Sequence, residues 1–187
     1  MNMIDKYLKY ISEQLLNFPS TRQTNSSNCG PSVVKSILLY YGIDVNEDTL
    51  AEEMGTSDNG TSPNDIVKAF ISRGLKVKKG KMTIDKISKF ITEKIPIILC
   101  IQAWSKNDIN YSKTFKHGHY VVAIGADDKK VYFNDPSIKK DLAYLDHDEL
   151  MNRWHDVDKN GIRYINFGIA VYGMNPKFKT STSGKIK

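Results

Sequence analysis

The stretch that decides the fold is QTNSSNCGPSVVKSILLYYG, residues 23–42. Polar, turn-forming residues lead up to Cys29, and Pro31 follows two positions later, where the first turn of a helix tolerates proline. The apolar run that comes next has helical length and stops at Gly42, a residue type that commonly ends helices. The pattern predicts a buried helix that begins at Cys29 and runs to about Tyr41.

A thiol at the start of a helix has a distinctive environment. The N-terminus of a helix carries partial positive charge and free N–H groups, which favour the thiolate over the thiol. The thiolate is the nucleophilic form of cysteine. The sequence therefore predicts a thiol enzyme with Cys29 as the nucleophile, provided that a base lies nearby. The alternative is a structural cysteine at a helix start.

Size and composition indicate one ordinary globular domain. The chain has 187 residues, of which 40% are hydrophobic and 26% are charged, enough for one core and too few for two comfortable ones. The other cysteine, Cys100, lies in an apolar run that resembles a buried strand, so we expect two free thiols and a reducing compartment. No segment has the length of a membrane span or the pattern of a secretory signal. We expect a cytoplasmic protein with no membrane insertion, although export without a signal stays open.

The net charge of +6 raises the question of nucleic acid. The excess is nearly all lysine, scattered without a basic stripe, which favours a solvated surface and no nucleic-acid partner. His117 and His119 have no accompanying cysteines or acids at ligand spacing, so we expect neither a metal nor another cofactor. Residues 156–161 begin like a calcium loop, but Phe167 stands where such a loop needs glutamate, and a hairpin turn is expected instead.

The order of the predicted elements indicates an α+β fold, in which N-terminal helices pack on a mostly antiparallel sheet. Residues 1–175 are expected to form the domain, and residues 176–187 a loose basic tail. Apolar spacing and turn signals predict the boundaries. The predicted helices are 3–16, 29–41, 49–54, 62–74, 83–94 and 146–155, and the predicted strands are 75–77, 95–104, 119–126, 130–134 and 164–172.

A histidine and an acid occupy suggestive places in the strand pair. His119 opens one strand, after a glycine that leaves backbone room, and Asp135 follows the next strand. If the loop is residues 127–129, Ala126 pairs with Lys130, and Asp135 becomes a same-face diagonal neighbour of His119, ~7–8 Å away at the backbone. A loop one residue longer or shorter would place Asp135 on the other face. His119 as a mere strand-end residue and Asp135 as a mere turn residue remain the alternatives.

Gln23 completes the candidate set. Attack on an acyl carbon places negative charge on the carbonyl oxygen, and hydrogen-bond donors aimed at that oxygen stabilise it. The side-chain amide of Gln23 and the backbone N–H of Cys29 could supply those donors. A neutral amide does not compete with a thiolate–imidazolium pair. The alternative is an ordinary solvated loop glutamine.

The combined motifs resemble family thirty-nine of the cysteine peptidases, papain-like enzymes that trim double-glycine leaders from exported bacterial peptides. The resemblance covers about residues 20–138. It implies a papain-like cysteine protease fold, with Cys29 as nucleophile, His119 as base, Asp135 as its orienting acid and Gln23 in the oxyanion hole. Asn28 departs from the aspartate that the family often has there. The motifs are Gln23-x5-Cys29-Gly30-Pro31, Tyr40-Tyr41-Gly42, Gly118-His119-Tyr120-Val121-Val122 and Asn134-Asp135-Pro136.

The chain has no membrane segment and no nucleotide-binding loop, so it resembles a stand-alone relative. We expect a cysteine peptidase that hydrolyses a bond in a peptide or protein substrate. Two alternatives stay open, namely an acyl or peptidyl transferase on the same scaffold and a non-catalytic peptide-binding module. The oligomeric state is open as well.

Overall fold

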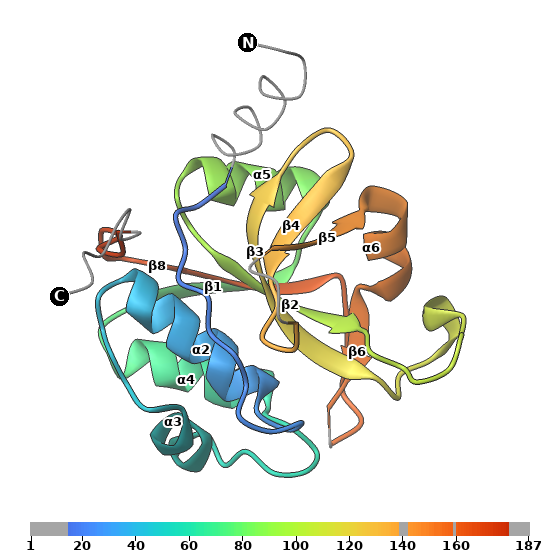
Figure 1. Cartoon of the computed structure of the whole chain (residues 1–187), viewed down its shortest axis with the longest axis horizontal. Coiled ribbons are helices and arrows are strands. Elements are labelled where there is room, and N and C mark those ends of the chain that lie inside the picture. Colours follow the sequence, from blue (N-terminus) through green and yellow to red (C-terminus); the bar gives the residue numbers. More distant parts are fainter. Residues whose placement is uncertain (1–14, 139–141, 159, 180–187) are drawn as a thin grey trace, which may run out of the picture.

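The computed structural model describes residues 15–138, 142–158 and 160–179. Helices near the N-terminus gather on one side of a central sheet, and two later helices lie on its other side (Figure 1). The predicted α+β class is thereby confirmed. The helices are α2 (Cys29–Tyr40), α3 (Glu47–Glu53), α4 (Pro63–Ile71), α5 (Ile84–Thr92), the short 3-10 helix η1 (Tyr111–Lys113) and α6 (His147–Arg153).

The main sheet has six strands in the order β1-β8-β2-β3-β4-β5, and every neighbouring pair is antiparallel. A second sheet pairs β6 with β7, also antiparallel. The strands are β1 (Lys76–Lys81), β2 (Ile97–Gln102), β3 (Gly118–Ala126), β4 (Lys130–Asn134), β5 (Ala143–Asp146), β6 (His155–Val157), β7 (Arg163–Ile165) and β8 (Phe167–Tyr172).

The sheet has an apolar core on each face, because side chains alternate along a strand. From β2 and β3, Ile98 and Val122 pack with α2 and α4 on one face, whereas Leu99 and Val121 pack with α5 and α6 on the other. Every residue of β2 is buried, as expected of a central strand covered on both sides. Burial of this apolar surface holds the helices against the sheet and so fixes the end of α2 relative to β3.

Capping residues set the helix starts. The Ser62 side chain accepts a hydrogen bond from the Asn64 N–H, so α4 begins with Pro63, as predicted. The helix predicted over 49–54 begins earlier, at Glu47, because the Asn46 side chain accepts from the N–H of Asp48 and starts it there. The prediction missed this asparagine cap.

The β3–β4 hairpin differs from the predicted one near its turn. Ala126 pairs with Val131, whereas the prediction paired it with Lys130. The connection is therefore one residue longer than expected, a change that by itself would place Asp135 on the wrong face.

A β-bulge at Ile124 reverses that change. The register shifts between Ala123 and Gly125, and beyond the bulge Val122 pairs with Asn134, as the predicted parity requires. The carbonyl of Ile124 accepts a hydrogen bond from the N–H of Leu16, so the bulge is held by the N-terminal segment. Asp135 therefore lies on the same face of the sheet as His119, as predicted. The longer connection and the bulge, neither of which was predicted, compensate for each other.

The strand predicted over 164–172 is interrupted. Asn166 has a left-handed backbone, with φ of 49°, and its N–H bonds to the carbonyl of Trp154. The chain turns there, so β7 pairs with β6 while β8 enters the main sheet. The turn expected at residues 156–161 does join β6 to β7.

The two ends of the chain lie partly outside the described residues. Most of the helix predicted over 3–16 falls there, and its last residues are not helical, because Leu15 bridges to Gly125. Of the predicted tail, Lys177 and Phe178 donate backbone hydrogen bonds to the carbonyl of Tyr40, and the residues after 179 are not described, so the tail stays a prediction. Across the described ranges, none of the helices has the length and apolar character needed to span a bilayer.

Candidate active site

Cys29 is the first residue of α2 and is 8% exposed. The helix behind it is almost wholly buried, which anchors the sulfur to the core. The hydroxyl of Thr21 donates to the carbonyl of Ser32 over 3.1 Å and ties the preceding loop to this helix. As the first helical residue, Cys29 has a backbone N–H with no acceptor one turn earlier in the helix.

His119 links the cysteine to an acid. Its Nε2 lies 2.8 Å from Oδ1 of Asp135, and the two residues are 6% and 7% exposed. Cys29 lies close enough to His119 to raise the pKa of its ring. Because Nε2 is engaged by Asp135, Nδ1 is the ring nitrogen left to face the sulfur. The structure thus brings these three predicted residues together, with a hydrogen bond between His119 and Asp135 and with Cys29 beside the ring.

These contacts change the protonation of His119. Burial opposes the charged ring and lowers its pKa, but the hydrogen bonds to Asp135 and Cys29, together with their negative charges, outweigh burial and raise the pKa to about 9. The ring therefore carries a proton at neutral pH. A protonated ring donates from both nitrogens, which suits a carboxylate on one side and a sulfur on the other.

Asp135 has two functions in the fold. Its Oδ1 accepts the backbone N–H of Ser137 at 2.8 Å, the Asx-turn contact expected before Pro136, and also receives His119. The turn that was the competing interpretation of Asp135 thus exists and holds the carboxylate toward the ring. Ser137 was missed by the sequence analysis, although the Asp-Pro pair is a recognisable turn signal.

Gln23 lies beside this turn. Its backbone N–H donates to the carbonyl of Pro136 at 3.1 Å, and its Oε1 accepts from the hydroxyl of Ser137 at 2.8 Å. Its Nε2 donates to the carbonyl of Asn25 at 2.7 Å. The side chain is therefore fixed between the Asp135 turn and the loop that leads to Cys29. Its predicted role toward an oxyanion stays a prediction.

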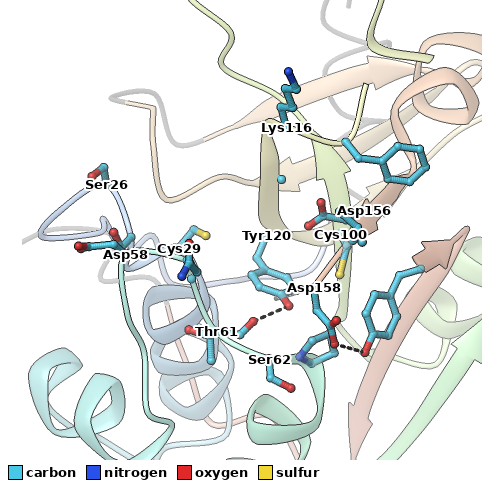
Figure 2. Close-up of a pocket in the computed structure, with 18 residues that line it drawn as sticks. Ser26, Cys29, Asp58, Thr61, Ser62, Cys100, Lys116, Tyr120, Asp156 and Asp158 are labelled. Atoms are coloured by element: carbon cyan, nitrogen blue, oxygen red, sulfur yellow. Dashed lines mark hydrogen bonds between the residues drawn. The ribbon is translucent and has the colours of Figure 1, made fainter. Parts of the chain in front are cut away.

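A cleft of about 460 Å³ opens next to Cys29. Figure 2 shows the sulfur on one wall and Cys100, Asp156 and Asp158 on the opposite one, with Tyr120 between them. The hydroxyl of Tyr120 donates to the carbonyl of Thr61, which holds the 58–63 loop at the edge of the cleft.

The wall of the cleft opposite Cys29 carries two acidic side chains, Asp156 and Asp158. Burial raises the pKa of Asp156 to about 6, although hydrogen bonds from the Val157 backbone and the Gln102 amide oppose that change. Gly118 makes room for this carboxylate, because a Cβ there would lie 2.3 Å from it. From its sequence pattern, Asp156 is predicted only as part of a turn. Within the described part of the chain, no three His, Cys, Asp or Glu side chains gather closely enough to hold a metal ion.

Comparison with known proteins identifies the class. A model of the Peptidase C39 family matches residues 17–157. The chain belongs to the Peptidase C39 family, which confirms the resemblance found in its motifs.

Individual relatives are similar at moderate identity. An uncharacterized protein of Methanothermobacter thermautotrophicus is 28% identical over 116 residues, which are 62% of this chain and 70% of that protein. A double glycine motif protease from an AMS/PCAT transporter, crystallised with its leader peptide, superposes with a TM-score of 0.63 at 20% identity over 89% of this chain and 97% of that one. A C39-like peptidase from Bacillus anthracis gives a TM-score of 0.64 at 17% identity over 87% and 98% of the two chains. These structures share the papain-like fold, as predicted.

Proposed function

We propose that this chain is a cysteine peptidase that hydrolyses a peptide bond through Cys29, His119 and Asp135. The observation that carries the proposal is the buried His119–Asp135 pair beside Cys29 at the N-terminus of a buried helix. The helix end and the protonated ring both favour negative charge on the sulfur. Membership of the C39 family supports the same chemistry.

The geometry suits acyl transfer in two stages. In the first, the Cys29 thiolate attacks the carbonyl carbon, an S–C bond forms, and the carbonyl oxygen becomes an oxyanion. The imidazolium of His119 then gives its proton to the departing amine as the C–N bond breaks, which leaves a thioester. In the second, water attacks the thioester while His119 accepts its proton, and the sulfur departs as thiolate. Asp135 keeps the ring oriented throughout.

The oxyanion needs two donors, and we assign them to the Cys29 backbone N–H and the Gln23 side-chain amide. The side-chain amide of Gln23 is held by Ser137 and Asn25, so little reorganisation accompanies the reaction. Preorganised donors of this type are worth about 10²–10³ in rate.

We assign a peptide as the substrate class. The cleft beside Cys29 has a volume typical of sites for small ligands or short chain segments. A similar structure was crystallised with a leader peptide. Because its identity to this chain is 20%, a mixed-sequence test is preferable to one restricted to double-glycine peptides.

The test is digestion of a mixed-sequence peptide library, read by mass spectrometry. The wild-type protein should cleave a subset of peptides, and Cys29→Ala should cleave none of them. Addition of a primary amine then separates hydrolysis from transfer, since a transferase would yield amine-capped products in place of free acids. Cleavage that persists in Cys29→Ala, or an intact library with no thioester detected on Cys29, would refute the proposal.

A further inference from the structure

Glu47 is a buried carboxylate that the mechanism above does not use. It is 4% exposed and is the first residue of α3. Its Oε1 accepts three hydrogen bonds, from the Thr24 N–H at 2.9 Å, the Thr24 hydroxyl at 2.8 Å and Nδ2 of Asn28 at 3.1 Å. Across residues 15–138, 142–158 and 160–179, no cationic side chain forms an ion pair with it. Burial of an ionised carboxylate is unfavourable unless such bonds compensate for lost water.

All three bonds go to one short loop. This loop, residues 24–28, starts directly after Gln23 and ends directly before Cys29. The two proposed oxyanion donors therefore lie at its two ends. A carboxylate that binds both Thr24 and Asn28 fixes the distance between those ends, and hydrogen bonds to an ionised acceptor are the stronger kind.

The Asn28 side chain shows the consequence for the helix end. Asn28 occupies the N-cap position of α2, where an asparagine side chain normally accepts from the first helical N–H groups. Here it makes no capping bond, and its Nδ2 donates to Glu47 and to the Thr24 hydroxyl. Glu47 and Thr24 thus hold the Asn28 side chain directly before Cys29, whose backbone N–H is one of the proposed oxyanion donors.

We propose that Glu47 is a positioning residue that sets the geometry of the oxyanion donors at Gln23 and Cys29. Glu47 does not line the cleft beside Cys29, and the inference rests on the proposed peptidase function. The start of the loop is fixed separately, because the backbone N–H of Gln23 donates to the carbonyl of Pro136. Loss of the Glu47 charge should therefore disturb the loop between two otherwise intact anchors.

Two probes separate this role from general structural damage. A short peptide aldehyde, acetyl-Gly-glycinal, adds to the Cys29 sulfur, and its carbonyl oxygen becomes the oxyanion or takes a proton from His119. Iodoacetamide alkylates the same sulfur with departure of iodide and forms no oxyanion. A defect confined to the oxyanion donors should weaken the aldehyde adduct and leave alkylation unchanged.

The matched variants are Glu47→Gln, which keeps the shape and removes the charge, and Asp48→Asn, which removes an exposed charge from the same helix. In Glu47→Gln we expect aldehyde affinity to fall about 10-fold or more and alkylation to stay within about 2-fold. In Asp48→Asn we expect neither the alkylation rate of Cys29 nor the affinity for the aldehyde to change. Thr24→Val, which removes one donor from the loop side, should give a smaller loss of the same kind.

Hydrogen–deuterium exchange of residues 24–29 supplies a readout that needs no adduct, and it should accelerate in Glu47→Gln. Wild-type aldehyde affinity in Glu47→Gln, equal losses with both probes, or unchanged exchange would overturn the inference. A wild-type protein that formed no aldehyde adduct would refute the proposed function. Accelerated exchange in Glu47→Gln would still show, in that case, that Glu47 holds the 24–28 loop in place.

Discussion

The two cysteines face the same cleft and are both nearly buried, at 8% for Cys29 and 2% for Cys100, yet their surroundings are opposite in chemical effect. Cys29 lies at a helix N-terminus with a protonated imidazole against it. Cys100 lies within β2, paired with Tyr120 on β3. Burial raises the pKa of the Cys100 thiol, and the charge of Asp156 raises it further.

Because both thiols are nearly buried, the two sites differ in the charges around the sulfur and not in solvent exposure. A thiolate in the interior needs a positive partner to replace the water it has lost. His119 supplies positive charge beside Cys29, whereas Asp156 adds negative charge near Cys100. The predictions that follow test this contrast between the two thiols.

The largest effect is expected from removing each sulfur in turn. Cys29→Ala should lower kcat/KM for the best-cleaved library peptide by about 1,000-fold or more, because the nucleophile is lost. Cys100→Ala should leave kcat/KM within a few-fold and lower the free energy of unfolding by about 1–2 kcal/mol, since it leaves a small core cavity. Peptide turnover and urea unfolding measure the two quantities. A large loss of peptide turnover in Cys100→Ala would contradict the assignment of Cys29, and not Cys100, as the nucleophile.

Removal of the imidazole should make the two thiols more alike. In His119→Ala, iodoacetamide should alkylate Cys29 about 10-fold or more slowly at pH 6, because the positive charge that favours thiolate is gone. Alkylation of Cys100 should not change. Quantitative peptide mass spectrometry follows both sites in one sample, and unchanged Cys29 labelling would show that His119 does not activate the sulfur.

The Asp135 charge should be visible in the pH profile. His119 must be protonated to release the amine, so kcat/KM of the wild type should fall as pH rises through about 9. Asp135→Asn removes a cause of the raised pKa, which should move this limb toward about 7 and lower kcat/KM at pH 8 about 10-fold. Asp128→Asn, in the exposed turn of the same hairpin, is the control. An alkaline limb that stays in place would rule out the coupling of Asp135 to His119.

The same pair affects stability. A raised histidine pKa contributes stability that is fully present below about 6.5 and lost as pH rises through about 9. The wild type should therefore lose more free energy of unfolding between pH 6.5 and 9 than Asp135→Asn does.

The smallest effect is expected at Asp156. Its pKa is raised to about 6, so the folded state disfavours its charge, and the associated stability is present below about 3.9 and lost as pH rises through about 6. Asp156→Asn keeps an acceptor for the Gln102 amide and should raise the free energy of unfolding at pH 8 by about 1–2 kcal/mol relative to the wild type. Urea unfolding at pH 4 and pH 8 measures this. A loss of stability at pH 8 would mean that the charge is stabilised in the cleft.

Local patterns were sufficient to predict the parts of the fold closest to the chemistry. The loop, proline and apolar run around Cys29 specify a helix start through short-range rules, and the strand pair places His119 near Asp135. The predicted hairpin places Asp135 on the correct face but has the wrong turn length. The longer turn is compensated by the bulge at Ile124. That bulge depends on Leu16, a contact more than a hundred residues distant in sequence.

The features that the sequence did not reveal depend on tertiary contacts. Glu47 has no distinctive local pattern, and its importance appears only once the fold places it under the 24–28 loop. The interruption at Asn166 depends on its bond to Trp154, and Asp156 enters the cleft because Gly118 leaves space for it. Such positions become visible only when the packing is known.

The most direct measurement is the alkylation of the two cysteines by iodoacetamide in the native wild-type protein, followed site by site from pH 5 to pH 10. We expect Cys29 to be alkylated completely at pH 6, before labelling of Cys100 is detectable, and Cys100 to react only near the alkaline end or on unfolding. Equally slow alkylation of both thiols at pH 6 would contradict the account, because it would mean that neither the helix end nor His119 activates Cys29.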